Sequence, residues 1–500
     1  MTRVPASHRA DVPPPRGGLA DQATTSVAWS VSQKWVIRIT GLLTVAILTR
    51  LLSPADFGVV AVALTLLPLV QVLSDLGFSA YLVQADRIDR RMLSTAFWFS
   101  AGMGVLLSGG MVLAAVPVSR VLQLPEVEPV IQAFGVATLS VTLGSVPVAL
   151  MRRELRFRAL AVQAVVAGAI GQAIAIALAL AGFGVWALVA QTVVFQLITT
   201  ILAFWATRWH PAFAFSRADL SRMALFGGKV VSVELVTIGR LWAENAIVVS
   251  LLGPTGLGYL NIAQRLVQTA QDLSTSALVP VSVVVFARVR DAADRLRAGY
   301  LRAQGISYAI VAPIMVLLAV GTPWLLPLMF GPQWTPSILP GQILAVAGIF
   351  MLGALDHGLF YGLGRPGRWF VYATVIEAIA LTTTALTAPH GLVAIALGAL
   401  AVAITATIAR WFLVGPLLAA PWWRIAQPLG RVLLPALAAG GGGMLAGHLA
   451  GELPPVVVVL LIGATVLPIY VLLVRFSSRS VWDDVRGLAG TAVARARRRS

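Results

Sequence analysis

The stretch "LTRLLSPADFG", from Leu48 to Gly58, has a counterpart in "SLLGPTGLG", from Ser250 to Gly258, and both stretches lie between long apolar runs. Aligned without a gap, the segments 51–74 and 251–274 are identical at nine positions. Apolar runs often agree by chance, so the shared Pro, Gly and Gln residues carry most of the information. These are Pro54 and Pro254, Gly58 and Gly258, and Gln71 and Gln271. The two stretches therefore indicate an internal repeat.

The composition is typical of a membrane protein. Of 500 residues, 58% are hydrophobic and 11% are charged, which is more apolar surface than a soluble core of this size could hide. The net charge of +17 is spread in small groups between apolar segments, so nucleic-acid binding is not expected. The chain has no cysteine, which excludes disulfides, thiol catalysis and cysteine-ligated metals.

The membrane topology follows from apolar length and from basic loops. A helix needs about 20 apolar residues to cross the bilayer, and the sequence predicts fourteen such helices. Basic residues cluster at the amino terminus and in every second connection, so the positive-inside rule places both termini in the cytoplasm. The clusters are Arg87, Arg90 and Arg91; Arg152, Arg153, Arg156 and Arg158; Arg208, Arg217 and Arg222; Arg288, Arg290, Arg295, Arg297 and Arg302; Arg365 and Arg368; Arg424 and Arg431; and the arginines from Arg475 onward.

The repeated turns divide the predicted helices into two halves. The first turn joins predicted spans 30–52 and 57–82, and the second joins 223–252 and 256–287. Both turns lie on the outer side, so we expect an all-α membrane protein with two six-helix bundles, a parallel pseudo-twofold repeat and a C-terminal helix pair, with the substrate site between the halves. The expected divisions are a disordered cytoplasmic arm at 1–29, an N-terminal lobe at 30–206, a cytoplasmic linker at 207–222, a C-terminal lobe at 223–415, a linker and two extra transmembrane helices at 416–474, and a basic cytoplasmic tail at 475–500.

Two segments resemble a known transporter family. "TRLLSPADFGVVAVA" is similar to the first hairpin signature of oligosaccharide flippases in the multidrug/oligosaccharidyl-lipid/polysaccharide exporter superfamily, and "LMFGPQWTPSILPGQILAVAG" is similar to their segment between spans nine and ten. The branch it most resembles is the colanic-acid-exporter-like lipopolysaccharide biosynthesis group. The resemblance covers residues 28–420 and implies two six-helix bundles around a central cavity. It also implies that the protein moves an undecaprenyl-diphosphate-linked oligosaccharide from the cytoplasmic to the outer leaflet of the bacterial plasma membrane. It implies no particular site residue, because the family has no strict catalytic signature.

A diphosphate that crosses an apolar layer needs cations and hydrogen-bond donors, so charged residues inside spans are the candidate site. Span eight carries polar residues at steps of four, three, four and three, which form one continuous stripe on a helix. They are Asn261, Arg265, Gln268, Asp272 and Thr275. The candidate substrate-binding residues are Lys34, Arg38, Lys229, Arg240, Arg265, Gln268 and Asp272. The candidates for ion coupling are Asp75, Glu234 and Glu244.

Several of these residues have a plainer interpretation. Lys34 and Lys229 lie near cytoplasmic helix ends, where snorkelling to the interface explains them equally well. Asp75, Asp356, His357, Glu377 and Arg410 look isolated, which favours hydrogen bonding between helices.

The depths of the charges in spans seven and eight predict one ion pair. Glu244 and Arg265 lie about ten residues to either side of the outer turn, so we expect them to meet, leaving Arg240 free for substrate.

Three other functions are possible for a basic chain that crosses the membrane many times. A membrane glycosyl polymerase or ligase would place acid/base residues on a large loop, and the sequence has no such loop, no P-loop, no paired catalytic carboxylates and no histidine metal motif, so we expect neither an enzyme nor a metal or other cofactor. A multidrug exporter would have a more acidic and aromatic cavity. A peptidoglycan-precursor exporter of the same superfamily stays open. The expected partners are the lipid-linked oligosaccharide, membrane lipids, a polysaccharide polymerase and glycosyltransferases.

The topology can be tested with reporter fusions. Reporters placed after Arg158 and after Arg302 should report cytoplasm, and reporters in 253–256 and 331–333 should report the outside. Alkaline phosphatase and green fluorescent protein activities would measure this. A cytoplasmic signal from either outer site would contradict the fourteen-span topology.

Overall fold

The computed structural model describes residues 40–85, 88–154, 156–275, 293–451 and 453–478, together with the pairs 482–483 and 486–487. The described residues form helices and turns, with no strand among them, and twelve of these helical segments are long and apolar enough to cross a membrane. The expected all-α membrane architecture is confirmed. The helices of the first half are α2 (Pro54–Leu64), α3 (Leu66–Asp75), α4 (Phe78–Gln84), α5 (Arg90–Leu122), α6 (Val127–Arg153), α7 (Phe157–Leu180) and α8 (Val185–Thr207). They are followed by α9 (Arg217–Thr275), α11 (Ala293–Phe330), η1 (Pro332–Ser337), α12 (Ile338–Phe350), α13 (Ala354–Gly362), α14 (Pro366–Thr387), η2 (Ala388–His390), α15 (Leu392–Val414), η3 (Gly415–Leu417), α16 (Trp422–Leu449) and α17 (Pro455–Ser477).

The count of fourteen spans stays a prediction. The first expected span is described only as the apolar helix Thr40–Leu51, and expected spans seven and eight run together in α9. The backbone of α9 leaves the helical region at Gly253, with φ 70° and ψ 177°, a conformation that glycine adopts without a Cβ clash. Glu244 and Arg265 line one cavity, although an unbroken helix would separate them by about 32 Å. The chain therefore turns back at Gly253.

The start of α2 has a strong local signal. Ser53 accepts a hydrogen bond from the backbone N–H of Asp56 at 3.2 Å, and the Asp56 carboxylate accepts from the Ser53 N–H at 2.9 Å. This is a capping box, which satisfies two helix-end N–H groups at once. Pro54 occupies the first helical position, where its missing N–H costs nothing. The sequence "SPAD" thus ends one helix and begins the next.

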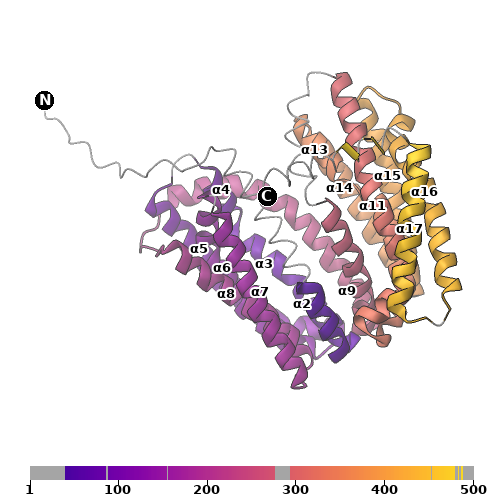
Figure 1. Ribbon diagram of the computed structural model, residues 1–500. Coiled ribbons are helices and arrows are strands. Elements are labelled where there is room, and N and C mark those ends of the chain that lie inside the picture. The colour runs from indigo at the N-terminus through magenta and orange to yellow at the C-terminus, as the bar shows by residue number, and fades with distance from the viewer. Residues whose placement is uncertain are drawn as a thin grey trace, which may run out of the picture.

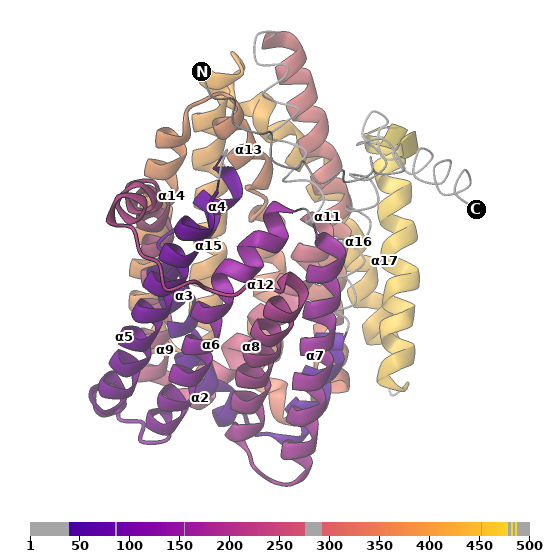
Figure 2. The ribbon, with the colours of Figure 1, turned by 90° about the vertical axis from the view of Figure 1, so that its left-hand side faces the viewer.

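The two halves of the chain meet at one end and diverge toward the other, with α9 between them (Figure 1). In the N-terminal half, α5, α6, α8 and α7 lie in a row, which Figure 2 shows from the front. In the C-terminal half, α12 packs against α11 and α15, and α14 packs against α15. The final pair, α16 and α17, packs on α11, where the Tyr470 hydroxyl donates to the Ala309 carbonyl at 3.0 Å.

The repeated Pro and Gly residues contact each other across the halves. A Cβ added at Gly58 would overlap the carbonyl oxygen of Pro254, and a Cβ added at Gly258 would overlap the carbonyl oxygen of Pro54. The contact is reciprocal, so each copy of the motif supplies the small residue that the other copy requires. Only glycine permits this approach between backbones. The repeat in the sequence is therefore a pair of matched surfaces that join α2 to α9.

A buried tryptophan reinforces the same end of the molecule. Trp334 in η1 is fully buried, with its ring centroid 5.3 Å from that of Phe57 and 5.9 Å from that of Tyr259. Its indole N–H donates to the Thr49 carbonyl at 3.0 Å, and the Gln333 amide donates to the same oxygen at 2.5 Å. Thr49 lies in the last turn of its helix, where carbonyls lack intrahelical partners. The segment "GPQWTPS" thus joins the helix Thr40–Leu51 to α11 and α12.

Some expected boundaries fall outside the described residues or change. The arm at 1–29 and most of the tail at 475–500 lie outside the described residues, although α17 continues to Ser477. The linker expected at 207–222 is shorter, because α8 ends at Thr207 and α9 begins at Arg217. This connection is held against α5, where the Ser216 N–H donates to the Thr95 hydroxyl at 3.0 Å.

Alanine substitution tests the close contact between the halves. Gly58→Ala and Gly258→Ala should each destabilise the protein by about 1–3 kcal/mol, because the added methyl group meets rigid backbone. Gly168→Ala is the control, since no atom lies within 4 Å of its added Cβ, and it should leave stability unchanged or slightly raised. Thermal unfolding of the purified protein in detergent measures both. Equal melting temperatures for all three variants would contradict this prediction, because they would show that the backbones at Gly58 and Gly258 can move apart at little cost in stability.

Candidate functional site

A cavity of about 760 Å³ lies within the C-terminal half, and its walls come from both parts of α9 and from α12, α14 and α15. The polar stripe predicted on span eight faces it, because Asn261, Arg265 and Gln268 all line the cavity. Its remaining walls are mostly apolar. A polar cavity among apolar helices is the arrangement that the charged residues predict. All of the lining residues belong to the C-terminal half, whereas the sequence predicted a site between the halves.

Arg240 is not free, contrary to the expectation from the sequence. Its guanidinium forms ion pairs with Glu244, one turn further along α9, and with Glu377 of α14. All three side chains are largely buried, with 20%, 16% and 31% of their surface exposed. The expected pair between Glu244 and Arg265 is wrong, because the four-residue spacing of Arg240 and Glu244 brings these two together on one helix. Arg240 is thus neutralised by two carboxylates and braces α9 against α14.

Arg265 is the exposed cation of the cavity. Three arginines line the cavity, namely Arg240, Arg265 and Arg410, and both others are in ion pairs. Among the residues that the structure describes, none forms an ion pair or hydrogen bond with the Arg265 guanidinium, and the Thr269 hydroxyl donates only to the Arg265 backbone carbonyl. Its side chain is exposed to the cavity, beside Gln268 on the same face of α9. An exposed guanidinium between apolar helices is well suited to bind an anion, because its planar donors match phosphate oxygens.

Arg410 of α15 belongs to a buried network that joins α15 to α11, α12 and α13. Its guanidinium lies 3.3 Å from the Asp356 carboxylate, and the hydroxyl of Tyr300 in α11 donates to the same carboxylate. Arg410 also donates to the Phe350 carbonyl at 2.6 Å. That carbonyl is at the end of α12, where the chain is non-helical from Met351 to Gly353 before α13 begins. The network therefore satisfies a helix break beside the cavity, and helix-to-helix bonding, as expected, accounts for Asp356 and Arg410.

The side chains of five other predicted site residues lie outside the part of the chain that the structure describes. Lys34 and Arg38 lie outside the described residues. Lys229, Glu234 and Asp272 belong to α9, but their side chains are outside the described part of the structure.

Asp75 and His357 make contacts of other kinds. Asp75 accepts hydrogen bonds from the backbone N–H and hydroxyl of Ser79 at 3.1 Å and 2.6 Å, and so caps α4. His357 packs its ring on that of Tyr361, with centroids 4.2 Å apart.

Sequence reasoning missed several residues that line the cavity. Glu377 and Arg410 looked isolated, because their partners are more than 50 residues away along the chain. The amides Asn245 and Gln264 also line the cavity, and they flank Glu244 and Arg265 in the sequence. The aromatic residues Trp369 and Tyr372 come from α14, whose sequence pattern shows no polar face. Of these contacts, only the Arg240–Glu244 ion pair could have been recognised from the sequence, because the two residues are four positions apart on one helix.

Comparison with known proteins identifies the family. A profile of the polysaccharide biosynthesis protein family matches residues 47–339, more than half of the chain. The chain belongs to this family. It is 27% identical over 365 residues to the succinoglycan biosynthesis transport protein ExoT of Rhizobium meliloti, covering 73% of this chain and 74% of that protein. It is 24% identical over 340 residues to the lipopolysaccharide biosynthesis protein WzxC of Escherichia coli, covering 66% and 68%.

Solved structures of known transporters share the fold of this polysaccharide biosynthesis protein. The lipid II flippase MurJ in an inward closed conformation superimposes with a TM-score of 0.71 at 13% identity, covering 90% of this chain and 99% of that one. An inward-facing multidrug resistance transporter of the MATE family gives a TM-score of 0.57 at 14% identity, covering 78% and 95%. These likenesses establish the fold, and the polysaccharide biosynthesis protein is a multi-pass membrane protein of this architecture.

The charge arrangement predicts that substitution of Arg240 destabilises the protein, whereas substitution of Arg265 does not. Arg240→Gln should lower the stability of the purified protein by about 1–3 kcal/mol and reduce its level in membranes, because Glu244 and Glu377 lose their shared cation. Arg265→Gln is the matched control and should leave both unchanged. Melting temperature in detergent and immunoblotting of membranes measure these effects. A stable Arg240→Gln beside an unstable Arg265→Gln would reverse the two roles.

Proposed function

We propose that this protein is a flippase that moves an undecaprenyl-diphosphate-linked oligosaccharide from the inner to the outer leaflet of the bacterial plasma membrane by alternating access. The observation that carries the proposal is Arg265, an exposed cation in a polar cavity of a membrane protein from a polysaccharide biosynthesis family. The transport protein ExoT and the lipopolysaccharide biosynthesis protein WzxC, both similar over about two thirds of this chain or more, support the same role.

The chemistry of the cavity fits such a substrate. A diphosphate in an apolar layer needs a guanidinium that is not already neutralised, and Arg265 meets that need beside the amides of Asn261 and Gln268. Sugar hydroxyls can exchange hydrogen bonds with the amides, and the apolar C–H face of a sugar ring can stack on an aromatic ring such as that of Trp369. Lys34, Arg38, Lys229 and Asp272 complete the proposed substrate-binding set. Arg240, predicted from the sequence to belong to this set, lines the cavity but is neutralised by Glu244 and Glu377, so its proposed role is to hold α9 against α14 around the substrate.

The proposed topology has fourteen spans, two six-helix bundles related by a parallel repeat, and both termini in the cytoplasm. On this topology the end joined by Pro54, Gly58, Pro254 and Gly258 is the outer end, and the halves diverge toward the cytoplasm (Figure 1). The substrate would enter from the inner leaflet. Release outside requires that the contacts of Trp334 and the reciprocal glycine contacts separate while the cytoplasmic ends close.

Ion coupling is proposed for the carboxylates Asp75, Glu234 and Glu244. Glu244 has the most suitable position, because it lines the cavity and shares Arg240 with Glu377. Neutralising one carboxylate would change the balance of this triad while the other still holds Arg240, which is the property that a coupling site needs. The proposed partners are a polysaccharide polymerase and the glycosyltransferases that supply and use the lipid-linked glycan.

Two alternatives belong to the same superfamily, and a third to another class. A peptidoglycan-precursor exporter is favoured by the structural likeness to the lipid II flippase, which bears on fold alone. A multidrug exporter fits the likeness to a multidrug resistance transporter in the same limited way. A membrane glycosyl polymerase or ligase fits less well, because the ionised residues that line the cavity are already in ion pairs or, as at Arg265, basic.

Arg265 substitutions test the proposed function in a strain that lacks the native gene. Arg265→Ala should reduce surface polysaccharide about tenfold or more at normal protein level and cause lipid-linked glycan to accumulate in the inner leaflet, because the diphosphate loses its cation. Arg265→Lys should retain part of the activity, since it keeps the charge without the planar fork. Full export by Arg265→Ala would remove Arg265 from the site.

The same strain separates the alternatives. Lipid-linked glycan that reaches the outer leaflet but stays unpolymerised would indicate a polymerase or ligase. Increased drug sensitivity with normal polysaccharide would indicate a multidrug exporter, and loss of viability with arrested peptidoglycan synthesis would indicate a peptidoglycan-precursor exporter.

A further inference from the structure

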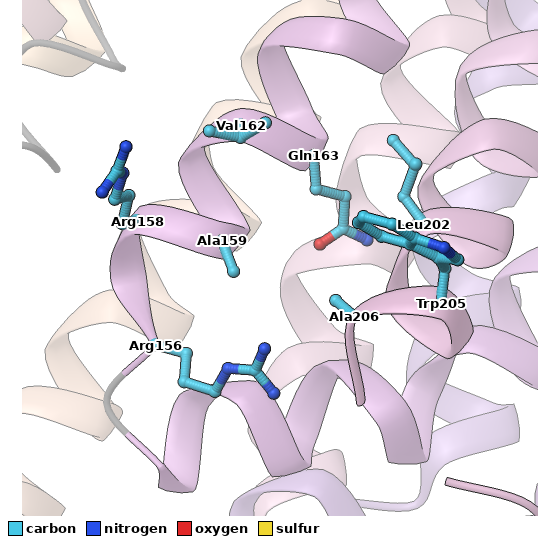
Figure 3. Close-up of a pocket in the computed structure, with 8 residues that line it drawn as sticks. All are labelled: Arg156, Arg158, Ala159, Val162, Gln163, Leu202, Trp205 and Ala206. Atoms are coloured by element: carbon cyan, nitrogen blue, oxygen red, sulfur yellow. The ribbon is translucent and has the colours of Figure 1, made fainter. Parts of the chain in front are cut away.

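A second cavity, of about 400 Å³, lies between α7 and α8 in the N-terminal half (Figure 3). Its walls are apolar, with Ala159 and Val162 from α7 facing Leu202 and Ala206 from α8. It shares no lining residue with the cavity of the C-terminal half. Its helices also lie apart from that site, since α7 packs against α8 and α6 at the end of the row in Figure 2. This cleft is therefore separate from the proposed substrate site.

The cleft opens to the surface that faces lipid. Trp205 forms part of its wall and is 77% exposed, and Ile201, one turn earlier on α8, is 62% exposed. Both residues belong to an apolar helix long enough to cross the membrane. Tryptophan near the end of a transmembrane helix is typical of the zone between headgroups and acyl chains. The open side of the cleft is thus at the depth where a phospholipid changes from polar to apolar.

The mouth of the cleft is basic. Arg156 and Arg158 line it, and Figure 3 shows the Arg156 side chain extending toward α8 below Ala159. The segment 152–158 contains four arginines and one acidic residue, Glu154, which lies 3.5 Å from Arg156 at an exposed position. The amino terminus of α7 adds partial positive charge at the same place, where no side chain caps the helix. The mouth therefore favours an anion.

The deep end of the cleft is closed. The buried Gln163 side chain donates from its amide to the Thr199 carbonyl at 2.5 Å and so ties α7 to α8. Beyond this bond the two helices pack directly, with Gly171 beside the Gln191 carbonyl. The space that is left is short, apolar and open on one side, with cations at one end. This shape and polarity match the upper part of an acyl chain joined to a phosphate headgroup.

The geometry points to a binding site for one anionic glycerophospholipid, with its phosphate beside the Arg156 guanidinium at the mouth and its acyl chain between α7 and α8 along Trp205. Arg158 lines the same cavity but projects to the other side of α7, so it adds positive charge near the mouth without enclosing the phosphate (Figure 3). By the proposed topology this lipid belongs to the inner leaflet. An anionic headgroup is required because the net charge of the mouth is positive. The bound lipid would fix the start of α7 and fill the gap between two helices that are otherwise joined at this end by the Gln163 bond.

Native mass spectrometry of the whole protein tests the site with defined lipids. The detergent-solubilised protein would be titrated with palmitoyl-oleoyl phosphatidylglycerol and, separately, with palmitoyl-oleoyl phosphatidylcholine. We expect one phosphatidylglycerol to be retained in preference to phosphatidylcholine. Arg156→Gln with Arg158→Gln should weaken that retention about thirtyfold, a factor of about five for each arginine lost.

Two further variants separate a shaped site from general charge attraction. Ala206→Phe should abolish retention by filling the cleft while both arginines stay, and Ala173→Phe, at an exposed position elsewhere on α7, is its control. Arg90→Gln with Arg91→Gln removes the same charge from the start of α5 and should leave retention unchanged.

Three results would overturn the proposal. They are equal retention of the two lipids, full retention by Ala206→Phe, and preferential displacement of phosphatidylglycerol by undecaprenyl phosphate at equal concentration. The last result would assign the cleft to the substrate lipid instead. Because these measurements report binding without transport, they are independent of the test of the proposed function.

Discussion

The close approach of α2 to the region around Gly253 in α9 is the constraint on which the rest of the structure depends. Two glycines, Gly58 and Gly258, each sit against the carbonyl of the proline that begins the other motif. No side chain fits between these backbones, so the halves can meet here only if both motifs keep a glycine at the same position. The turns before α2 and at Gly253 bring these residues to one end of the molecule. Trp334 then covers the contact and links it to α11 and α12.

The cavity depends on how buried charges are shared. Arg240 is balanced by Glu244 and Glu377, and Arg410 is balanced by Asp356 and held by the Phe350 carbonyl. Each of these arrangements joins at least two helices around the cavity, so the charges that look functional in sequence are largely part of the scaffold. A buried charge without a partner is strongly destabilising, which explains why Arg240 and Arg410 both have carboxylate partners. Arg265 differs because it is exposed to the cavity, where an anionic ligand can reach it.

The two cavities are suited to different ligands, although the groups that line them are similar. Both combine guanidinium groups with apolar walls, which suits molecules that carry phosphate and hydrocarbon together. The cavity of the C-terminal half is enclosed by four helices and contains amides that can bind sugars, as a transported glycan requires. Among the residues that line the cleft between α7 and α8, the one amide is Gln163 at the deep end, and it already donates to the Thr199 carbonyl. The cleft opens directly to lipid. On these two proposals, one half of the molecule carries the site for transport, and the other carries a binding site for a membrane lipid.

Sequence alone determined the membrane class, the helical architecture, the repeat and the polar stripe of α9, because hydrophobic length, Pro–Gly turns and helical spacing are local properties. It also contained the Arg240–Glu244 pair, which a four-residue spacing favours on any helix. Only the tertiary structure decided which cation stays exposed. Glu377 approaches Arg240 from α14, and Asp356 approaches Arg410 from α13, across separations that no local pattern encodes. The packing of distant helices therefore neutralised Arg240 and left Arg265 facing the cavity, since ion pairing depends on distance in space and not on distance along the chain.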